Sequence, residues 1–151
     1  MEPRPIPRHT VLALRREVTD LRSFFDAAYP VLARVLEAAG VVPAACRAYY
    51  FSVPDESFDV AAAFVLSDAH RAAVATVLDA AEYPAQLLDF PEGSAVVARC
   101  EQDYAMLPEA WNQCETALRE SGYALSEVAF EDYVLMPGQN GGPVTDLYWY
   151  V

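Results

Sequence analysis

Apolar residues recur at helical spacing in two stretches of the chain. The first stretch has intervals of four and three, through Leu21, Phe25, Ala28, Leu32, Val35 and Ala39. This spacing places the apolar side chains on one face and predicts an amphipathic helix. Asp20 is its expected N-cap and Gly40 its expected C-terminal stop. Pro30 either kinks this helix or marks where its regular part begins. The second stretch predicts another helix, through Leu107, Trp111, Cys114 and Leu118, with Gly122 after it.

Short apolar runs between turn residues predict the strands. They cover residues 10–16, 47–53, 58–66, 94–100, 128–136 and 145–151. The second and third runs are separated by the turn sequence VPDES, which favours a hairpin. Residues 70–81 read as a shorter helix. Residues 83–90 are either a loop or a loop leading into a strand, and the following PEG predicts a turn.

The two halves repeat one another. A shift of 82 positions superposes the two helices, and a shift of 83 superposes Tyr50 on Tyr133. The pairs at a shift of 82 are Phe25 and Leu107, Tyr29 and Trp111, Leu32 and Cys114, Leu36 and Leu118, and Gly40 and Gly122. We therefore predict an α+β fold of duplicated β-α-β-β units with pseudo-twofold symmetry. In this predicted fold the antiparallel sheets carry the helices on one face, and we expect a ligand cleft between the halves.

One domain is expected over residues 1–151. Its first half covers about residues 8–68 and its second half about 92–151, with a connecting segment over about 69–91.

The composition argues against several classes of function. The net charge is −12, and all ten basic residues are arginines. The chain lacks the basic face that nucleic-acid binding requires, so we expect no direct contact with DNA or RNA. Acidity either serves solubility alone or attracts cations. No run is long enough to span a membrane, and no signal peptide is recognisable, so we expect a cytoplasmic protein. Three cysteines without a CxxC pair predict neither a disulfide nor a metal site.

Several short motifs, in order, resemble the GyrI-like family, the effector-binding domain of multidrug-sensing bacterial transcription regulators. The matching pieces are FPEGSAVVAR (90–99), Tyr104, EAW (109–111), SGY (121–123), FEDY (130–133) and TDLYWYV (145–151), and more loosely AYYFSVPDES (48–57). The family's Gly-Pro-Tyr turn is replaced by Gln102-Asp103-Tyr104, and the first half has Val18-Thr19-Asp20 there. No helix-turn-helix segment is present, so we expect a stand-alone member.

The resemblance implies that Glu131 is the family's binding glutamate. Strand alternation places Glu131, Tyr133 and Leu135 on one face. The alternative is a surface glutamate on an edge strand. The proposed aromatic walls are Tyr50, Trp111, Tyr133, Tyr148 and Trp149, each of which is otherwise an ordinary core residue. Tyr148 and Trp149 point to opposite faces, so at most one lines the cleft.

Three functions stay open. In the first, Glu131 and the aromatic rings bind hydrophobic, often cationic, small molecules, since ring faces attract cations. In the second, the chain is a hydrolase of reactive xenobiotics such as cyclopropane-containing alkylators, with Glu131 as general acid or base and Tyr133 or Tyr50 assisting. In the third, the acidic surface binds a protein partner such as a topoisomerase or a regulator. We expect no cofactor, no membrane partner and either a monomer or a homodimer.

Overall fold

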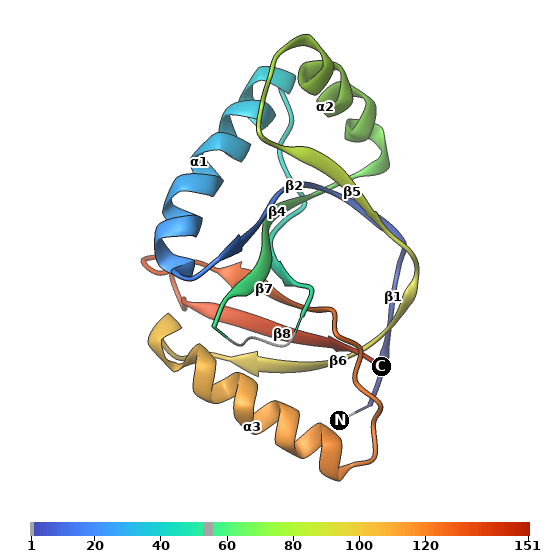
Figure 1. The fold of residues 1–151 in the computed structure, drawn as a ribbon, viewed down its shortest axis with the longest axis vertical. Coiled ribbons are helices and arrows are strands. Elements are labelled where there is room, and N and C mark those ends of the chain that lie inside the picture. Colours follow the sequence, from blue (N-terminus) through green and yellow to red (C-terminus); the bar gives the residue numbers. More distant parts are fainter. Residues whose placement is uncertain (1, 53–55) are drawn as a thin grey trace.

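The computed structural model describes residues 2–52 and 56–151, which form one eight-stranded antiparallel sheet, three α-helices and a short 3-10 helix (Figure 1). In chain order the elements are β1 (Arg4–Ile6), β2 (His9–Val18), α1 (Leu21–Ala39), β3 (Ala45–Tyr50), β4 (Phe58–Leu66), α2 (Asp68–Ala80), β5 (Gln86–Phe90), β6 (Gly93–Cys100), η1 (Tyr104–Met106), α3 (Leu107–Glu120), β7 (Ala129–Leu135) and β8 (Val144–Tyr150). The predicted α+β class is confirmed.

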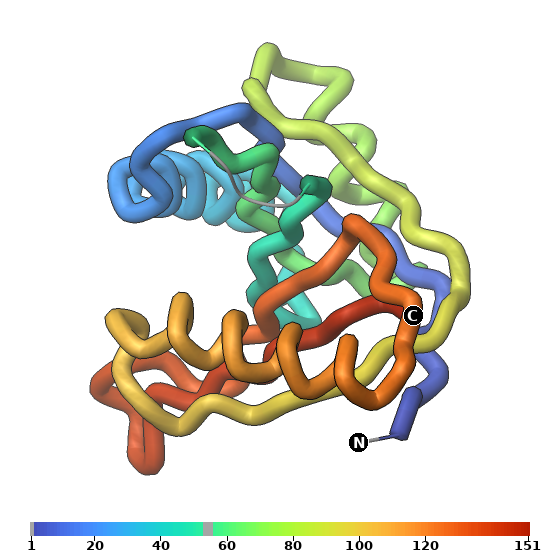
Figure 2. The backbone as a smooth tube through the Cα atoms, turned by 60° about the horizontal axis from the view of Figure 1, so that its bottom comes forward, coloured from blue at the N-terminus to red at the C-terminus, as the bar shows by residue number. Residues whose placement is uncertain are grey.

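The strand order across the sheet reflects the duplication. It runs β1-β6-β8-β7-β3-β4-β2-β5, so corresponding strands lie at equal distances from the centre. There β3 of the first half pairs with β7 of the second half, and this pairing joins the strands of both halves into one continuous sheet. The sheet curls, and α1 and α3 lie on the same face of it (Figure 2).

Helix α1 begins and ends at the expected residues. The Asp20 carboxylate accepts a hydrogen bond from the Ser23 backbone N–H at 3.2 Å. Gly40 adopts a left-handed conformation with φ of 65°, which an L residue rarely tolerates. The helix is continuous from Leu21 through Pro30, so Pro30 does not mark the start of its regular part.

Three other segments sharpen the sequence reading. Strand β3 begins at Ala45 and ends at Tyr50, and residues 53–55 of the expected turn lie outside the described residues. Strand β5 resolves the ambiguity over residues 83–90 in favour of a strand at their end. The sequence did not predict β1, because Pro5 lies within it and Pro3 and Pro7 flank it, and prolines argue against a strand. β1 is tolerated because it is an edge strand, paired with β6.

Two main apolar clusters lie beneath the helices, one in each half, and a smaller cluster of Cys100, Leu107 and Leu147 also lies under α3. The first contains Leu12, Leu14, Leu32 and Val35 under α1, with Val74 of α2. The second contains Val96, Cys114, Leu118, Ala129 and Trp149 under α3. The opposite sheet face carries a separate cluster that includes Tyr49 and Phe130. The central strands β3 and β7 therefore lie between the two helix-covered clusters.

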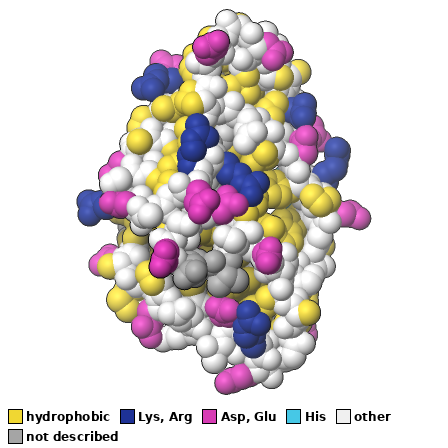
Figure 3. Space-filling view, in the orientation of Figure 1, with side chains coloured by type: hydrophobic (Ala, Val, Ile, Leu, Met, Phe, Trp, Pro, Cys, Tyr) yellow, Lys and Arg dark blue, Asp and Glu magenta, His cyan; other side chains and the backbone are white. Residues whose placement is uncertain are grey.

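Charged side chains are scattered over the face of the molecule seen in Figure 3. Acidic and basic side chains there are interspersed with apolar ones. In the described part of the chain, none of the helices is long and apolar enough to cross a membrane.

Candidate binding site

Glu131 lies at the centre of the sheet, on β7, directly opposite Ala48 of β3. The shift of 83 that superposes Tyr50 on Tyr133 also superposes Ala48 on Glu131. Two equivalent residues that face each other across neighbouring strands lie on either side of the local pseudo-twofold axis. The acidic side chain is therefore at the axis, and its counterpart is a methyl group.

The Glu131 carboxylate accepts three hydrogen bonds from aromatic side chains. The Tyr133 hydroxyl donates to Oε1 at 2.8 Å and the Tyr50 hydroxyl donates to the same oxygen at 3.1 Å. The indole Nε1–H of Trp111 donates to Oε2 at 2.8 Å. The two tyrosines are equivalent positions of the duplicated halves, so the pseudo-symmetry brings both hydroxyls to one oxygen.

Burial dominates the electrostatics of this cluster. Glu131 is only 3% exposed, and burial raises the pKa of its carboxyl above the usual range, although the hydrogen bonds from Trp111, Tyr133 and Tyr50 act to lower it. Burial and the nearby Glu131 carboxylate also raise the pKa of Tyr50 and of Tyr133 well above 10. Both tyrosines therefore stay protonated and act as hydrogen-bond donors at neutral pH.

No basic side chain among the described residues bonds to this carboxylate: its three partners are neutral donors. A buried anion without a counter-charge is unfavourable in a protein interior. This unbalanced charge is the chemical property that sets Glu131 apart from the acids of the five ion pairs recorded for the described residues.

A second layer of rings surrounds the first. Trp111 packs edge-on against Trp149, with ring centroids 4.4 Å apart. The ring centroids of Tyr104 and Tyr133 are 5.7 Å apart, and the Tyr104 hydroxyl contacts the sulfur of the exposed Met136. Because Glu131 is only 3% exposed, a ligand contacts its carboxylate only after some of the neighbouring side chains have moved.

The structure separates the candidates that the sequence grouped together. Tyr50, Trp111 and Tyr133 bond directly to Glu131, whereas Trp149 contacts it only through Trp111. Tyr148 lies on the opposite sheet face and stacks on Phe130 at 4.3 Å. The alternative of a surface glutamate on an edge strand is wrong, because β7 is central and Glu131 is buried.

Sequence reasoning missed Tyr29 as a member of this region. Tyr29 is the first-half counterpart of Trp111, and its hydroxyl donates to the Arg47 carbonyl at 2.6 Å. Burial raises the pKa of Tyr29, and Cys46 and Glu131 lie close enough to add to that rise. The duplication was the signal, since the same shift that matched the helices pairs Tyr29 with a residue that bonds to Glu131.

The fold is that of GyrI-like domains, as the sequence resemblance implied, and solved structures show it. The chain aligns with EcmrR in its DNA complex at a TM-score of 0.79 and 20% identity, over 98% of this chain and 55% of that one. It covers 94% of the isolated EcmrR C-terminal domain, with 99% of this chain aligned, at a TM-score of 0.78 and 17% identity.

Two further structures share the fold at lower identity. SAV2435 bound to tetraphenylphosphonium aligns at a TM-score of 0.69 and 12% identity, over 99% of this chain and 92% of that one. A hydrolase encoded by lin2189 from Listeria innocua aligns at a TM-score of 0.64 and 12% identity, over 98% of this chain and 90% of that one. No protein-family model matches the sequence, and no curated protein shows significant similarity to it.

Proposed function

We propose that this protein binds lipophilic organic cations beside Glu131, in a site floored by β3 and β7. The observation that carries the proposal is the buried carboxylate of Glu131, which has three neutral aromatic donors and no cationic partner among the described residues. A bound cation supplies the missing counter-charge, and the faces of Tyr50, Trp111 and Tyr133 add cation–π attraction. That the fold-related SAV2435 binds tetraphenylphosphonium supports this chemistry.

The aromatic walls favour breadth over selectivity. Ring faces and apolar contacts are weakly directional, so ligands of different shapes gain similar energies from them. Both Glu131 oxygens already accept hydrogen bonds, so the ligand needs no N–H group of its own. Delocalised or quaternary cations therefore fit the site at least as well as simple amines.

Two ions of nearly equal shape and opposite charge test the proposal. Tetraphenylphosphonium should bind saturably in isothermal titration calorimetry, and tetraphenylborate should not, because Glu131 repels it. Glu131→Gln keeps the side-chain shape and removes the charge, and we expect at least about a tenfold loss of phosphonium affinity. Glu120→Gln makes the same charge change on the exposed end of α3 and should leave affinity within about twofold. Equal binding of both ions, or an unchanged affinity in Glu131→Gln, would refute the proposal.

The raised pKa of Glu131 gives the binding a pH dependence. Below that pKa the carboxyl is protonated and offers no counter-charge; above it the carboxylate attracts the cation. Phosphonium affinity should therefore rise with pH until Glu131 is ionised and then level off. In Glu131→Gln the affinity should be flat over the same range. A wild-type profile that is also flat between about pH 4 and 8 would contradict the role of Glu131.

Hydrolysis of a reactive xenobiotic is the second candidate. It is favoured by the raised pKa of Glu131, which makes its carboxylate a stronger base than an exposed glutamate, and by the Tyr133 hydroxyl 2.8 Å from that carboxylate. Glu131 would take a proton from an attacking water, and Tyr133 would orient that water or protonate the leaving group. Turnover of a cyclopropane-containing alkylator, lost in a folded Glu131→Gln variant, would support hydrolysis. Stoichiometric binding with the substrate recovered intact would exclude it for that substrate.

A further inference from the structure

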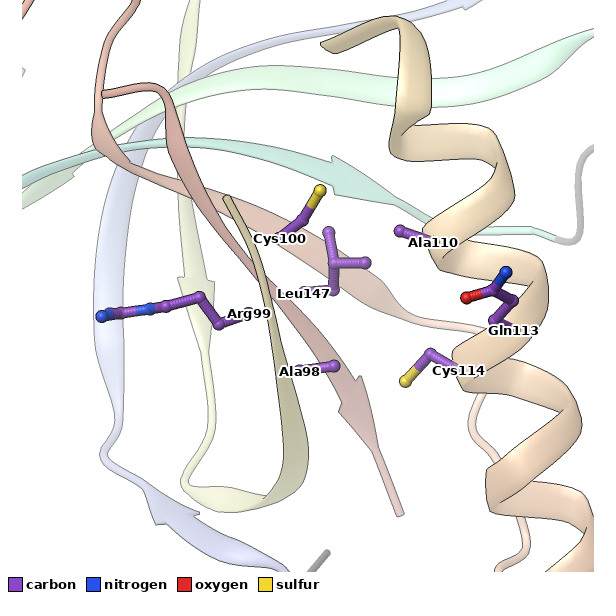
Figure 4. A pocket seen from close by; sticks show the side chains of 7 residues that line it. All are labelled: Ala98, Arg99, Cys100, Ala110, Gln113, Cys114 and Leu147. Atoms are coloured by element: carbon purple, nitrogen blue, oxygen red, sulfur yellow. The ribbon is translucent and has the colours of Figure 1, made fainter. Parts of the chain in front are cut away.

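A hollow lies beneath α3, and Glu131 is not among the residues that line it. It has a volume of about 280 Å³ and opens between α3 and strands β6 and β8 (Figure 4). Its walls are Ala98, Cys100, Ala110, Gln113, Cys114 and Leu147, together with part of Arg99. An engineered apolar cavity of about 150 Å³ binds benzene, so this space is large enough for a one-ring molecule with a substituent.

The duplicated first half shows why the hollow exists. Cys114 is the counterpart of Leu32, which is fully buried under α1. The Arg99–Asp146 ion pair of the second half corresponds to the Arg15–Asp59 ion pair of the first half. The residues directly before the two arginines are therefore also equivalent, so Ala98 is the counterpart of Leu14. In the first half both leucines belong to the packed cluster beneath α1. In the second half the smaller Ala and Cys stand at these positions, so part of the volume that the two leucine side chains fill in the first half is left open.

A buried hydroxyl without a partner among the described residues lies next to two residues of this wall, Cys100 and Leu147. Thr145 is 0% exposed, and its Oγ1 has no hydrogen-bond partner among the described residues. Thr145 is paired with Cys100 across β6 and β8 and shares a strand face with Leu147, and these two neighbours line the hollow. A ligand in the hollow reaches the Thr145 hydroxyl by passing between them. An unpaired buried hydroxyl is costly, and a ligand with a hydrogen-bond acceptor would satisfy it.

The hollow offers no charge to an ionic ligand. Arg99 is the charged residue at its wall, and its side chain points away from the other six, as Figure 4 shows. Its guanidinium pairs with Asp146 at 2.8 Å on the opposite sheet face. A cation or an anion entering the hollow would lose its hydration without gaining a partner, which excludes ions and favours neutral molecules.

We propose that the hollow between α3 and strands β6 and β8 is a second binding site, for small neutral aromatic molecules that carry a hydrogen-bond acceptor. The ring packs against Ala98, Cys114 and Leu147, and the acceptor takes the Thr145 hydroxyl. This site does not depend on the proposed cation binding. It adjoins Glu131, however, because Leu147 faces Glu131 across the strands and Trp111 directly follows Ala110.

Acetophenone and ethylbenzene form a matched pair of probes, since they share a ring and differ in the carbonyl acceptor. In two-dimensional ¹H–¹⁵N NMR titrations of the full chain, acetophenone should shift the amides of Ala110, Gln113 and Cys114. Thr145→Val is nearly isosteric and removes the hydroxyl. This substitution should lower the affinity for acetophenone about three- to tenfold and leave the affinity for ethylbenzene within about twofold of wild type.

Filling the hollow provides an independent test. Ala98→Leu and Cys114→Leu each introduce the first-half residue and should each reduce acetophenone affinity at least tenfold. Both variants should keep the dispersed amide spectrum of the wild type, which shows that they are folded. Failure of the cation proposal would instead appear as lost phosphonium binding in wild type with acetophenone binding intact. Acetophenone shifts that map to Glu131 and vanish in Glu131→Gln, or unchanged affinity in both leucine variants, would overturn the second site.

Discussion

At the scale of single residues, Glu131 depends on the side chains that surround it. Its carboxylate is buried and bonded to three donors, and each donor stabilises the ionised form. The donors therefore hold the pKa of Glu131 lower than burial alone would set it. Removing any one of them should make the carboxyl harder to ionise.

Tyr133→Phe removes one of these donors while keeping the ring. We expect the pKa of Glu131 to rise further, so the pH at which phosphonium affinity reaches half its plateau should move upward. Titration calorimetry across a pH series measures this midpoint. Tyr148→Phe makes the same change on the opposite sheet face and should leave the midpoint in place. A downward shift in Tyr133→Phe would show that the hydroxyl does not stabilise the anion.

His9 is a second titratable residue with a defined proton position. Its Nδ1–H donates to the Pro7 carbonyl at 2.9 Å, so Nε2 accepts from the Tyr49 hydroxyl at 2.8 Å. The Arg47 guanidinium donates to the same hydroxyl at 3.1 Å. Burial lowers the pKa of His9 below 6.5, and the charge of Arg47 lowers it further.

Because the folded protein lowers the pKa of His9, the unfolded chain binds a proton there more readily at pH values around and below 6.5. The free energy of unfolding should therefore fall as pH falls below about 6.5. Urea unfolding of wild type and of His9→Gln, from about pH 8 to pH 5, measures this. The wild type should lose more stability than the variant over that range. Parallel curves for the two proteins would show that His9 contributes nothing to the pH dependence.

At the scale of elements, local signals fix the helix ends. Asp20 caps α1, and Gly40 ends it in a left-handed conformation that directs its backbone N–H to the carbonyls of Leu36 and Glu37. Gly122 takes the same conformation after α3, with φ of 85°. The two ends are equivalent positions of the duplication, so the same backbone requirement keeps glycine at both.

Gly40→Ala should destabilise the protein by about 1–2 kcal/mol, because an L side chain is strained at φ of 65°. Nothing lies within 4 Å of the added Cβ, so the cost is conformational rather than steric crowding. Gly40→Asn should cost less, since asparagine tolerates this conformation. Chemical denaturation of both variants gives the comparison. An alanine variant as stable as wild type would contradict the strain argument.

At the scale of the whole molecule, the β3–β7 pairing joins the two halves and assembles the site. It places Ala48 opposite Glu131 and brings Tyr50 within hydrogen-bond distance. On the other sheet face it pairs Arg47 with Asp132 at 2.9 Å, and both side chains are mostly buried. The guanidinium also lies 4.5 Å from the centre of the Phe130 ring.

Asp132→Asn leaves the Arg47 charge buried without its counter-ion, and we expect a loss of about 2–5 kcal/mol. The ion pair between Arg119 and Glu115 is exposed, so Glu115→Gln should cost less than about 0.5 kcal/mol. Urea unfolding of both variants at neutral pH provides the values. If both substitutions cost the same, the Arg47–Asp132 pair does not stabilise the junction between the halves.

The sequence by itself determined the helices α1 and α3, most strands, the duplication and the placement of Glu131 and Tyr133 on one face. These features follow from periodicity over a few residues and from a constant shift between the halves. The sequence could not predict β1, which forms because β6 offers a partner. It also grouped Tyr148 with the site, because it left open which face of β8 meets Glu131.

Only the tertiary structure decided what surrounds Glu131. Trp111 is 20 residues away in the sequence and Tyr50 is 81, and their bonds depend on the position of α3 and on the register of β3 with β7. Likewise, the substitutions at Ala98 and Cys114 are readable in the sequence, but whether they leave a hollow depends on how α3 packs. Hydrogen bonds and voids between distant segments are set by packing geometry, which local residue patterns do not encode.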